Sequence, residues 1–310
     1  MMQSITPQST TSTTEATSFD GKLSKTEIIN LLEGQFKNDR EAENGTPSGN
    51  YYWYRKRKEI TTLLANNIEI LLKNKKPGEK IRFVDIGCGC GIDLFVLRDC
   101  AQQFSPDFEF IGLDGAPMSL DICKLKKEYY GVENLELHMA DLTGDLMFAD
   151  DSVDMIYCSE VVEHLIQPEK LFQEMHRVLK PNGLLMLTTP NEPNPLQRTY
   201  WDKKRRKRAL AKIEELRKVP QIVYFEGKEV ALYGHITCRT NREWDNAIES
   251  EGLRLLDYGR GGIIYGATTL ADRELTLGVR FLVEAVLDFL PKSWTRNLSN
   301  QLIGLYQVKG

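Results

Sequence analysis

The sequence has few of the features that mark secreted, membrane-spanning or nucleic-acid-binding proteins. Its six cysteines include no CxxC pair, which favours reduced thiols over a disulfide framework. No stretch is apolar enough for a transmembrane helix. The net charge of −4 and the pI of about 5.8 carry no global signature of nucleic-acid binding. We therefore expect a cytoplasmic protein for which nucleic acid is an improbable partner.

The beginning of the chain lacks the marks of a signal peptide. The first 20 residues contain no lysine or arginine and many serines and threonines, a composition that predicts a disordered tail. A chain of 310 residues can hold one α/β domain with additions. The expected parts are a disordered tail (1–26), an N-terminal helical cap (27–80), a core (81–190), a basic helical lid (191–234) and a C-terminal part with an apolar helical insertion (235–310).

The most informative stretch covers residues 84–91. An apolar, β-branched run ends in three glycines at alternate positions, Gly87, Gly89 and Gly91, and an amphipathic pattern follows. This order predicts a strand, a tight turn and a helix, with a backbone that a ligand can approach closely. The loop lacks the Gly-Lys-Ser/Thr ending of a phosphate-binding loop and departs from the G-x-G-x-x-G spacing of dinucleotide sites.

Strand and helix patterns alternate after this loop. Asp114 ends a second strand about twenty residues on, where an acid can accept hydrogen bonds from both hydroxyls of a ribose. Asp141 and Ser159 follow the third and fourth expected strands. The alternation predicts an α/β fold with a Rossmann-like, doubly wound and mostly parallel sheet. Ligands of such sheets bind at the carboxyl ends of the strands, where these three residues fall.

Several motifs together resemble one enzyme family. Residues 84–91 are similar to motif I of the class I S-adenosylmethionine (SAM) methyltransferases. Residues 150–165, 172–191 and 234–240 resemble the type 11 subfamily, which includes the ubiquinone-pathway O-methyltransferases; Cys90 departs from its usual small or neutral residues. The resemblance implies a seven-stranded sheet closed by an antiparallel C-terminal strand near residues 302–308, and SAM as the cofactor.

The resemblance also implies which residues hold SAM. The expected contacts in the core are Asp85, Gly87, Cys88, Gly89, Gly91, Asp114, Asp141, Leu142 and Ser159, with Asp141 reading the adenine amino group. In the aromatic segment before a helix expected from about Lys58 to Lys73, Tyr54 is expected to cover the cofactor. Arg57 is expected to pair with the methionine carboxylate. The alternative for this segment is a simple amphipathic helix that docks on the sheet.

Two histidines and two glutamates raise a question of catalysis. Glu160, Glu163 and His164 have the spacing of one helix face, and His235 offers a fourth ligand for a divalent ion. The reading that we favour involves no metal, only capping and orienting carboxylates. His235 and His164 are then the candidates for the general base, because imidazole titrates near neutrality. His235 is the first choice, since it lies beyond the fifth strand on the expected substrate side.

Two further segments stand outside the core motifs. The basic run 203–208 is either a solvated helix face or a surface for an anionic substrate or membrane. Residues 275–290 are almost wholly apolar, apart from charges at Arg280, Glu284 and Asp288 that form one narrow stripe. Such a helix is buried, lies in a homodimer interface, or makes peripheral contact with a membrane.

The expected function is methyl transfer from SAM to an oxygen or nitrogen atom of a small or lipid-linked acceptor. In-line positioning supplies most of the rate, and a histidine base assists. One alternative is a metal-assisted RNA 2′-O-methyltransferase, which the acidic pI disfavours. Another is a SAM-binding scaffold without activity, which the complete glycine loop and the presence of His164 and His235 disfavour.

Overall fold

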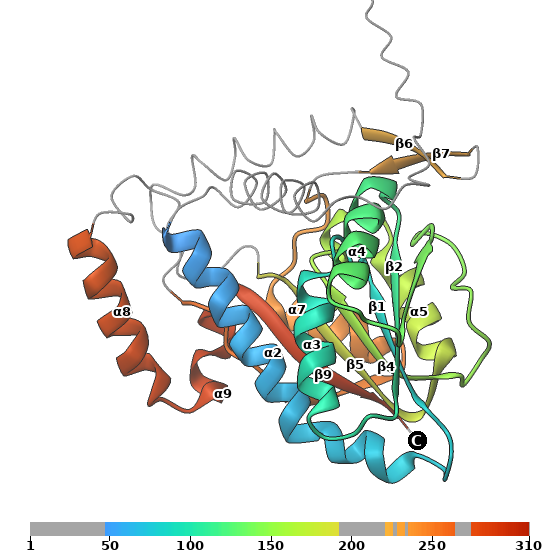
Figure 1. Cartoon of the computed structure of the whole chain (residues 1–310). Coiled ribbons are helices and arrows are strands. Elements are labelled where there is room, and N and C mark those ends of the chain that lie inside the picture. The colour runs from blue at the N-terminus through green and yellow to red at the C-terminus, as the bar shows by residue number, and fades with distance from the viewer. Residues whose placement is uncertain (1–46, 192–220, 226–227, 233–234, 264–273, 310) are drawn as a thin grey trace, which may run out of the picture.

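The computed structural model describes residues 47–191, 221–225, 228–232, 235–263 and 274–309. A seven-stranded sheet of order β3-β2-β1-β4-β5-β9-β8 forms its centre (Figure 1). The strands are β1 (Ile81–Ile86), β2 (Phe108–Asp114), β3 (Leu135–Met139), β4 (Val153–Ser159), β5 (Leu179–Pro190), β8 (Leu253–Tyr258) and β9 (Gln301–Val308). Strands β1 to β5 pair in parallel, and β9 lies antiparallel between β5 and β8. The expected Rossmann-like sheet with an antiparallel C-terminal strand is confirmed.

Helices cover both faces of this sheet (Figure 1). They are α2 (Pro47–Asn74), α3 (Ile92–Gln102), α4 (Pro117–Tyr129), α5 (Pro168–Val178), α7 (Asn241–Ser250), α8 (Glu274–Asp288) and α9 (Lys292–Thr295), with the 3-10 turns η1 (Val162–His164) and η3 (Arg296–Leu298). Helix α2 begins at Pro47, well before the expected start near Lys58, so the aromatic segment lies inside the helix. Proline suits the first turn of a helix, and no helix-breaking residue occurs between positions 51 and 73.

The apolar core consists of two clusters on opposite faces of the sheet. Adjacent residues of β1 show the division, because Phe83 belongs to the cluster under α2, α3 and α4, and Val84 to the cluster under α5 and α7. Successive side chains of a strand point to opposite faces, so a strand buried on both sides is apolar throughout. Trp244 of α7 is fully buried in the second cluster.

The topology gathers the functional loops at one edge. Because β1, β2, β4 and β5 are parallel, the segments that follow them leave the sheet on the same side. The amino end of β9 joins them there, since Gln301 pairs with Pro190 at the end of β5. The candidate site therefore lies where the chain passes from β1 to α3, from β2 to α4 and from β4 to η1.

The structure differs from the sequence-based prediction in the segment expected to be a helical lid. Strands β6 (Gln221–Phe225) and β7 (Lys228–Leu232) form an antiparallel hairpin near the end of the segment expected to be a helical lid. The expected tail and the basic run 203–208 lie outside the described residues. Between β8 and β9, the described residues form the helices α8 and α9 and the turn η3. Within the described parts of the chain, no helix has the length and apolar character needed to cross a membrane.

Candidate active site

The glycine loop between β1 and α3 is hydrogen-bonded to the end of β2. The N–H groups of Gly87 and Cys88 both donate to the Leu113 carbonyl, at 2.8 and 2.9 Å. Gly91 occupies the N-cap of α3, and its N–H donates to the Cys88 carbonyl at 2.8 Å. The φ angles of Gly87, Gly89 and Gly91 are 77°, 51° and 78°, a region that L side chains enter only at a cost. The predicted strand, turn and helix are therefore present.

The space around the three glycines of the loop differs from one position to the next. A Cβ on Gly87 would lie 2.2 Å from Val161 Cγ2, and one on Gly91 would lie 2.5 Å from Cys123 Sγ. A Cβ on Gly89 would meet no described atom within 4 Å. Gly87 and Gly91 are thus required by packing inside the protein, whereas Gly89 borders open space. At Gly87 the side chain of Val161, and not a ligand, excludes a larger residue.

Asp114 connects the loop to the start of α4. Its Oδ2 accepts from Gly89 N–H at 2.8 Å, and its Oδ1 accepts from Ala116 N–H at 2.7 Å. Burial raises the pKa of this carboxyl, and the two backbone donors oppose that rise. Each oxygen keeps a lone pair for a further donor. An acid held rigidly beside the open position at Gly89 suits the two hydroxyls of a ribose.

Asp85 is a second carboxyl at the same edge. It is buried, and its Oδ1 has no hydrogen-bond partner among the described residues. Burial, reinforced by the nearby charge of Asp93, raises the pKa of Asp85 well above its ordinary value. A buried acceptor that no described residue satisfies can take a further donor. The protonated amine of an amino-acid moiety is a donor of the required kind, so the residues present fit SAM.

The other expected cofactor contacts are distributed around this edge. The thiol of Cys88 lies in the first core cluster, so only its backbone is available to a ligand. Asp141 Oδ1 accepts from the N–H and hydroxyl of Thr143, at 2.9 and 2.7 Å, which fixes the turn after β3. Leu142 is partly buried against the second core cluster. Tyr54 is 62% exposed and therefore free to cover a ligand.

A buried lysine that the sequence analysis missed links α2 to the site. Lys56 Nζ lies 2.6 Å from Asp93 Oδ2 of α3 and donates to Ser159 Oγ of β4 at 2.9 Å. Arg57 Nε donates to the other Asp93 oxygen at 3.0 Å. The Lys56 ammonium also lies 4.2 Å from the centre of the Trp53 ring. Trp53, Lys56 and Arg57 share a helix face by their i, i+3, i+4 spacing, and that spacing was the signal available in the sequence.

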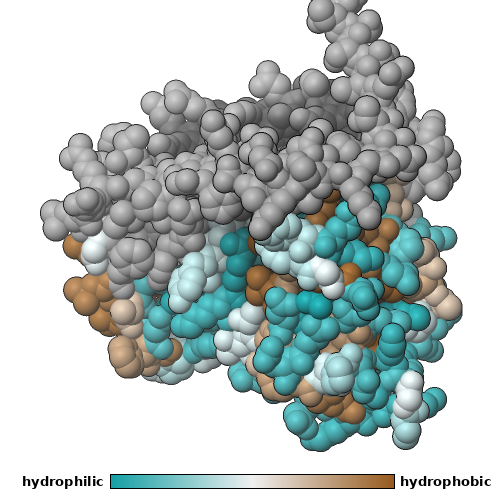
Figure 2. Space-filling view, in the orientation of Figure 1, coloured by the Kyte–Doolittle hydropathy of each residue, from teal (hydrophilic) through white to brown (hydrophobic). Residues whose placement is uncertain are grey.

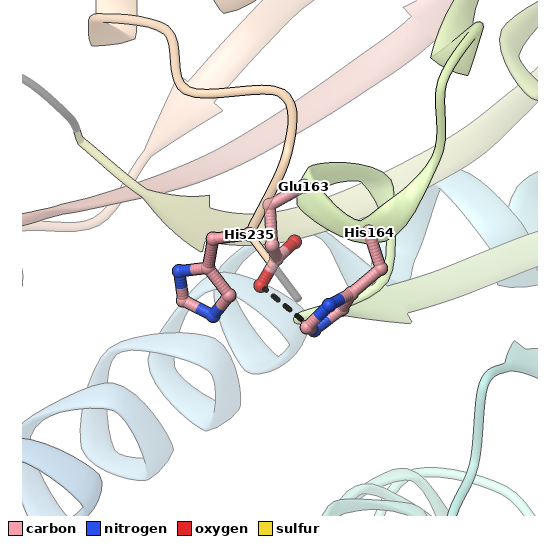
Figure 3. Close-up of side chains that lie close together, drawn as sticks. All are labelled: Glu163, His164 and His235. Carbon is pink, nitrogen blue, oxygen red and sulfur yellow. Dashed lines mark ion pairs between the residues drawn. The ribbon is translucent and has the colours of Figure 1, made fainter. Parts of the chain in front are cut away.

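The candidate catalytic side chains meet at one point (Figure 3). Ligand atoms of Glu163, His164 and His235 all lie within 4.8 Å of one another. The two imidazole rings are T-shaped, with centroids 5.0 Å apart, and His164 Nε2 is 3.9 Å from Glu163 Oε1. Backbone bonds fix this meeting, since Ile236 and Thr237 N–H donate to the Glu163 carbonyl at 2.9 and 3.0 Å. Residues more than seventy positions apart are thereby held as one unit.

Glu163 itself is buried. Its Oε2 accepts from Thr189 Oγ at 2.9 Å, while Oε1 has no hydrogen-bond partner among the described residues. Burial, and then the charge of Glu160, raise the pKa of Glu163 well above its ordinary value. One carboxylate with two imidazoles is also a donor set that suits a divalent transition metal.

Glu160 does not belong to this group, contrary to the expected helix face. It has a positive φ of 55° and precedes the short turn η1, so the four-residue helical spacing never forms. Its Oε1 accepts from Gln301 Nε2 at 2.6 Å and lies 3.4 Å from Thr188 Oγ. Of the four residues that the metal alternative named, the structure therefore brings together three, Glu163, His164 and His235.

The sheet topology, the glycine loop and its acid define a class I SAM-dependent methyltransferase domain. Residues 77–252 match the family model described as a methyltransferase domain, which covers more than half of the chain. The chain belongs to this family, and its methyl donor is SAM.

Curated relatives match over part of the chain. A ubiquinone biosynthesis O-methyltransferase of Cereibacter sphaeroides is 32% identical over 44% of this chain and 51% of its own length. An arsenite methyltransferase of Halobacterium salinarum is 30% identical over 36% of this chain and 27% of its own length. The chain thus spans from about a quarter to about a half of the length of these relatives.

Solved structures resemble the whole fold more loosely. A chain from the complex of the Haloferax volcanii Trm112 methyltransferase activator with a methyltransferase has a TM-score of 0.48 at 17% identity, covering 91% of this chain and 97% of that one. A geranyl diphosphate methyltransferase has a TM-score of 0.46 at 13% identity, covering 79% of this chain and 77% of that one.

Proposed function

We propose that this protein transfers the methyl group of SAM to an oxygen or nitrogen atom of a small or lipid-linked acceptor. The observation that carries the proposal is the arrangement at Gly89. Its N–H is held by Asp114, its Cα borders open space, and the orphaned oxygen of Asp85 lies at the end of the same strand pair. A methyl donor with a ribose and an amino-acid moiety presents groups complementary to both acids.

Each residue near the cofactor has a proposed role. Asp114 accepts from the ribose hydroxyls, and Asp141 accepts from the adenine amino group through the oxygen that Thr143 does not use. Arg57 donates to the methionine carboxylate with the guanidinium nitrogens that Asp93 leaves available, a charge-assisted bond. Tyr54, exposed on the face of α2, covers the cofactor from outside.

The histidine pair is proposed to serve the acceptor. When SAM is bound, it supplies an electrophilic methyl group, and the protein must then align the acceptor with it. His235 accepts the proton of the acceptor hydroxyl or amine, and His164 packs edge-on against its ring and restricts its orientation. Held by two backbone bonds to Glu163, the His235 loop positions the acceptor in addition to acting on its proton.

A second candidate function is methyl transfer assisted by a divalent metal. The specific observation in its favour is the group of Glu163, His164 and His235, whose ligand atoms lie within 4.8 Å of one another. A metal there would lower the pKa of an acceptor hydroxyl and orient it. Direct metal analysis of the purified protein separates this candidate from the first, which needs no ion.

The cofactor site can be tested with a matched pair of glycine variants. Gly89 and Gly131 both have a positive φ, and a Cβ on either meets no described atom within 4 Å. Gly89→Ala and Gly131→Ala should therefore cost similar stability, about 1 to 2 kcal/mol each. Only Gly89→Ala places a methyl group where we propose SAM binds, so calorimetry should show its SAM affinity lowered by at least about tenfold.

Two measurements test the proposal: the SAM affinity of the two glycine variants, and turnover of SAM by the wild-type protein. Equal SAM affinity in the two variants would contradict the assigned cofactor site. Formation of S-adenosylhomocysteine with a panel of phenols, amines and lipid-linked quinols would support the enzyme. SAM binding without turnover on any acceptor would favour the scaffold alternative.

A further inference from the structure

Helix α8 is inverted with respect to an ordinary surface helix. Its charged residues Glu284 and Asp288 face the body of the protein, and Glu284 is completely buried. The exposed apolar residues of the helix are Val279, Leu282, Val283 and Val286. Figure 1 shows α8 and α9 beside α2 at the margin of the molecule, and Figure 2 shows a brown apolar surface in the same place.

Ion pairs hold the charged side of α8 in place. Arg55 of α2 donates to both oxygens of Asp288, at 2.6 and 2.8 Å. Arg260 contacts Asp288 as well and lies 3.8 Å from Glu284. Glu284 Oε1 also accepts from Ile263 N–H at 2.6 Å. These bonds fix the rotation of the helix about its own axis, so the outward direction of the apolar side is built into the structure.

The outward side of the helix is a continuous apolar seam. Val279, Leu282, Val286 and Phe289 are 55%, 67%, 58% and 90% exposed, and Trp294 of α9 extends the seam with 71%. The first four recur at spacings of three, four and three residues. That spacing is the one with which helices interlock side chains with a neighbouring helix.

The size of the seam also suits a protein partner. A fully exposed aromatic side chain presents about 150–250 Å², so Phe289 and Trp294 alone offer roughly 300 Å². That is already the size of the largest apolar patch on many monomers, which is about 300–600 Å². Four exposed aliphatic residues add to it, Val279, Leu282, Val283 and Val286. The total approaches the roughly 800 Å² that each partner contributes to a standard interface.

The described charges beside the seam are paired within the protein. The described charges of α8 are the two carboxylates that face inward. The described cations of the following segment are already engaged, Lys292 with Glu59 at 2.9 Å and Arg296 with Asp245.

We infer that this protein forms a homodimer in which the α8–α9 seams of two copies pack against each other about a two-fold axis. The same seam on both copies gives an interface in which each apolar residue meets an apolar partner. The inference does not depend on the proposed acceptor, because the seam lies outside the cofactor loop and the histidine pair.

The test measures the mass of the full chain by sedimentation velocity over a wide range of concentrations. Leu282→Lys places an ammonium group at the middle of the seam, and we expect it to raise the dimer dissociation constant by roughly a hundredfold or more. Met147→Lys is the matched control, because Met147 is 60% exposed and lies in the loop between β3 and β4. Circular dichroism melting curves of both variants verify that each is folded.

A dimer for the wild type and Met147→Lys, with a folded monomer for Leu282→Lys, would support the inference. A wild-type monomer at every concentration would overturn it. So would a dimer that Leu282→Lys leaves intact, because the interface would then be elsewhere. A monomer that binds phosphatidylglycerol vesicles through Leu282 would assign the seam to a membrane.

Discussion

Replacing Lys56 with methionine tests whether the buried ion pair with Asp93 anchors α2 over the cofactor loop. Burial raises the pKa of Asp93, but the charges of Lys56 and Arg57, with hydrogen bonds from Lys56 and Tyr157, lower it to about 2. The ordinary value is 3.8, so the net shift corresponds to about 2.5 kcal/mol of stabilisation above pH 4. Methionine is nearly as long as lysine and keeps the apolar part of the side chain.

The size of the effect follows from what Lys56→Met leaves behind. Asp93 would stay only 12% exposed, with Arg57, which is itself 31% exposed, as its remaining cation. The pKa of Asp93 should then rise, and the stabilisation of about 2.5 kcal/mol is lost at neutral pH. Breaking a buried pair from one side typically costs 3–5 kcal/mol, so we expect roughly 3 kcal/mol with Arg57 still present.

Urea denaturation at pH 7, 4 and 3 is the assay. A carboxyl whose folded pKa is depressed contributes stability above its unfolded pKa and loses that contribution as the pH falls through the folded value. The difference between wild type and Lys56→Met should therefore be full at pH 7 and shrink between pH 4 and pH 2. Lys75→Met is the control, because Lys75 pairs at 2.9 Å with an Asp107 that is 52% exposed. Such a surface pair is worth less than about 1 kcal/mol.

The reasoning would be refuted if Lys56→Met cost no more than Lys75→Met, or if its cost were the same at pH 7 and pH 3. In the first case the buried pair would add nothing beyond a surface pair. In the second case the lost energy would come from packing, including the contact with the Trp53 ring, and not from the charge of Asp93.

Three further predictions concern the cofactor and the acceptor. Asp114→Ala should weaken SAM binding by roughly 1–3 kcal/mol in calorimetry, through the loss of hydrogen bonds to a charged acceptor; unchanged affinity would remove the ribose assignment. His235→Ala should lower methyl transfer while SAM affinity is preserved, with His176→Ala as the control outside the site. Equal losses of transfer and affinity in His235→Ala would make His235 an architectural residue. Elemental analysis should find a stoichiometric divalent ion, lost in Glu163→Gln, only if the metal-assisted candidate is right.

Local patterns in the sequence predicted the elements that carry the proposed cofactor residues. The strand, turn and helix around Gly87, Gly89 and Gly91 follow from neighbours in sequence, as does Asp114 at the end of the next strand. Parallel strands then carry these short segments to one edge of the sheet. Local patterns did not predict why glycine is needed at each of these positions. Val161, which fills the space beside Gly87, lies more than seventy residues away.

The candidate metal ligands also could not be predicted from local sequence patterns alone. The spacing of Glu160, Glu163 and His164 is that of a helix face, but the backbone at Glu160 has a positive φ and the helix does not form. Helical spacing predicts neighbours only where the chain is helical. His235 reaches Glu163 and His164 through backbone bonds that no sequence pattern encodes.

The sequence by itself determined the order of strands and helices, the glycine loop and the acid that follows it, because these depend on residues a few positions apart. It also showed that the charges of α8 form one stripe. Only the tertiary structure decided that the charged side of α8, and not its apolar side, faces the body of the protein. Arg55 and Arg260 bind it from other elements, Arg55 from more than two hundred residues away, and the energy of those contacts exists only once the chain has folded. The same dependence on distant partners buried Lys56 beside Asp93 and turned Glu160 toward Gln301.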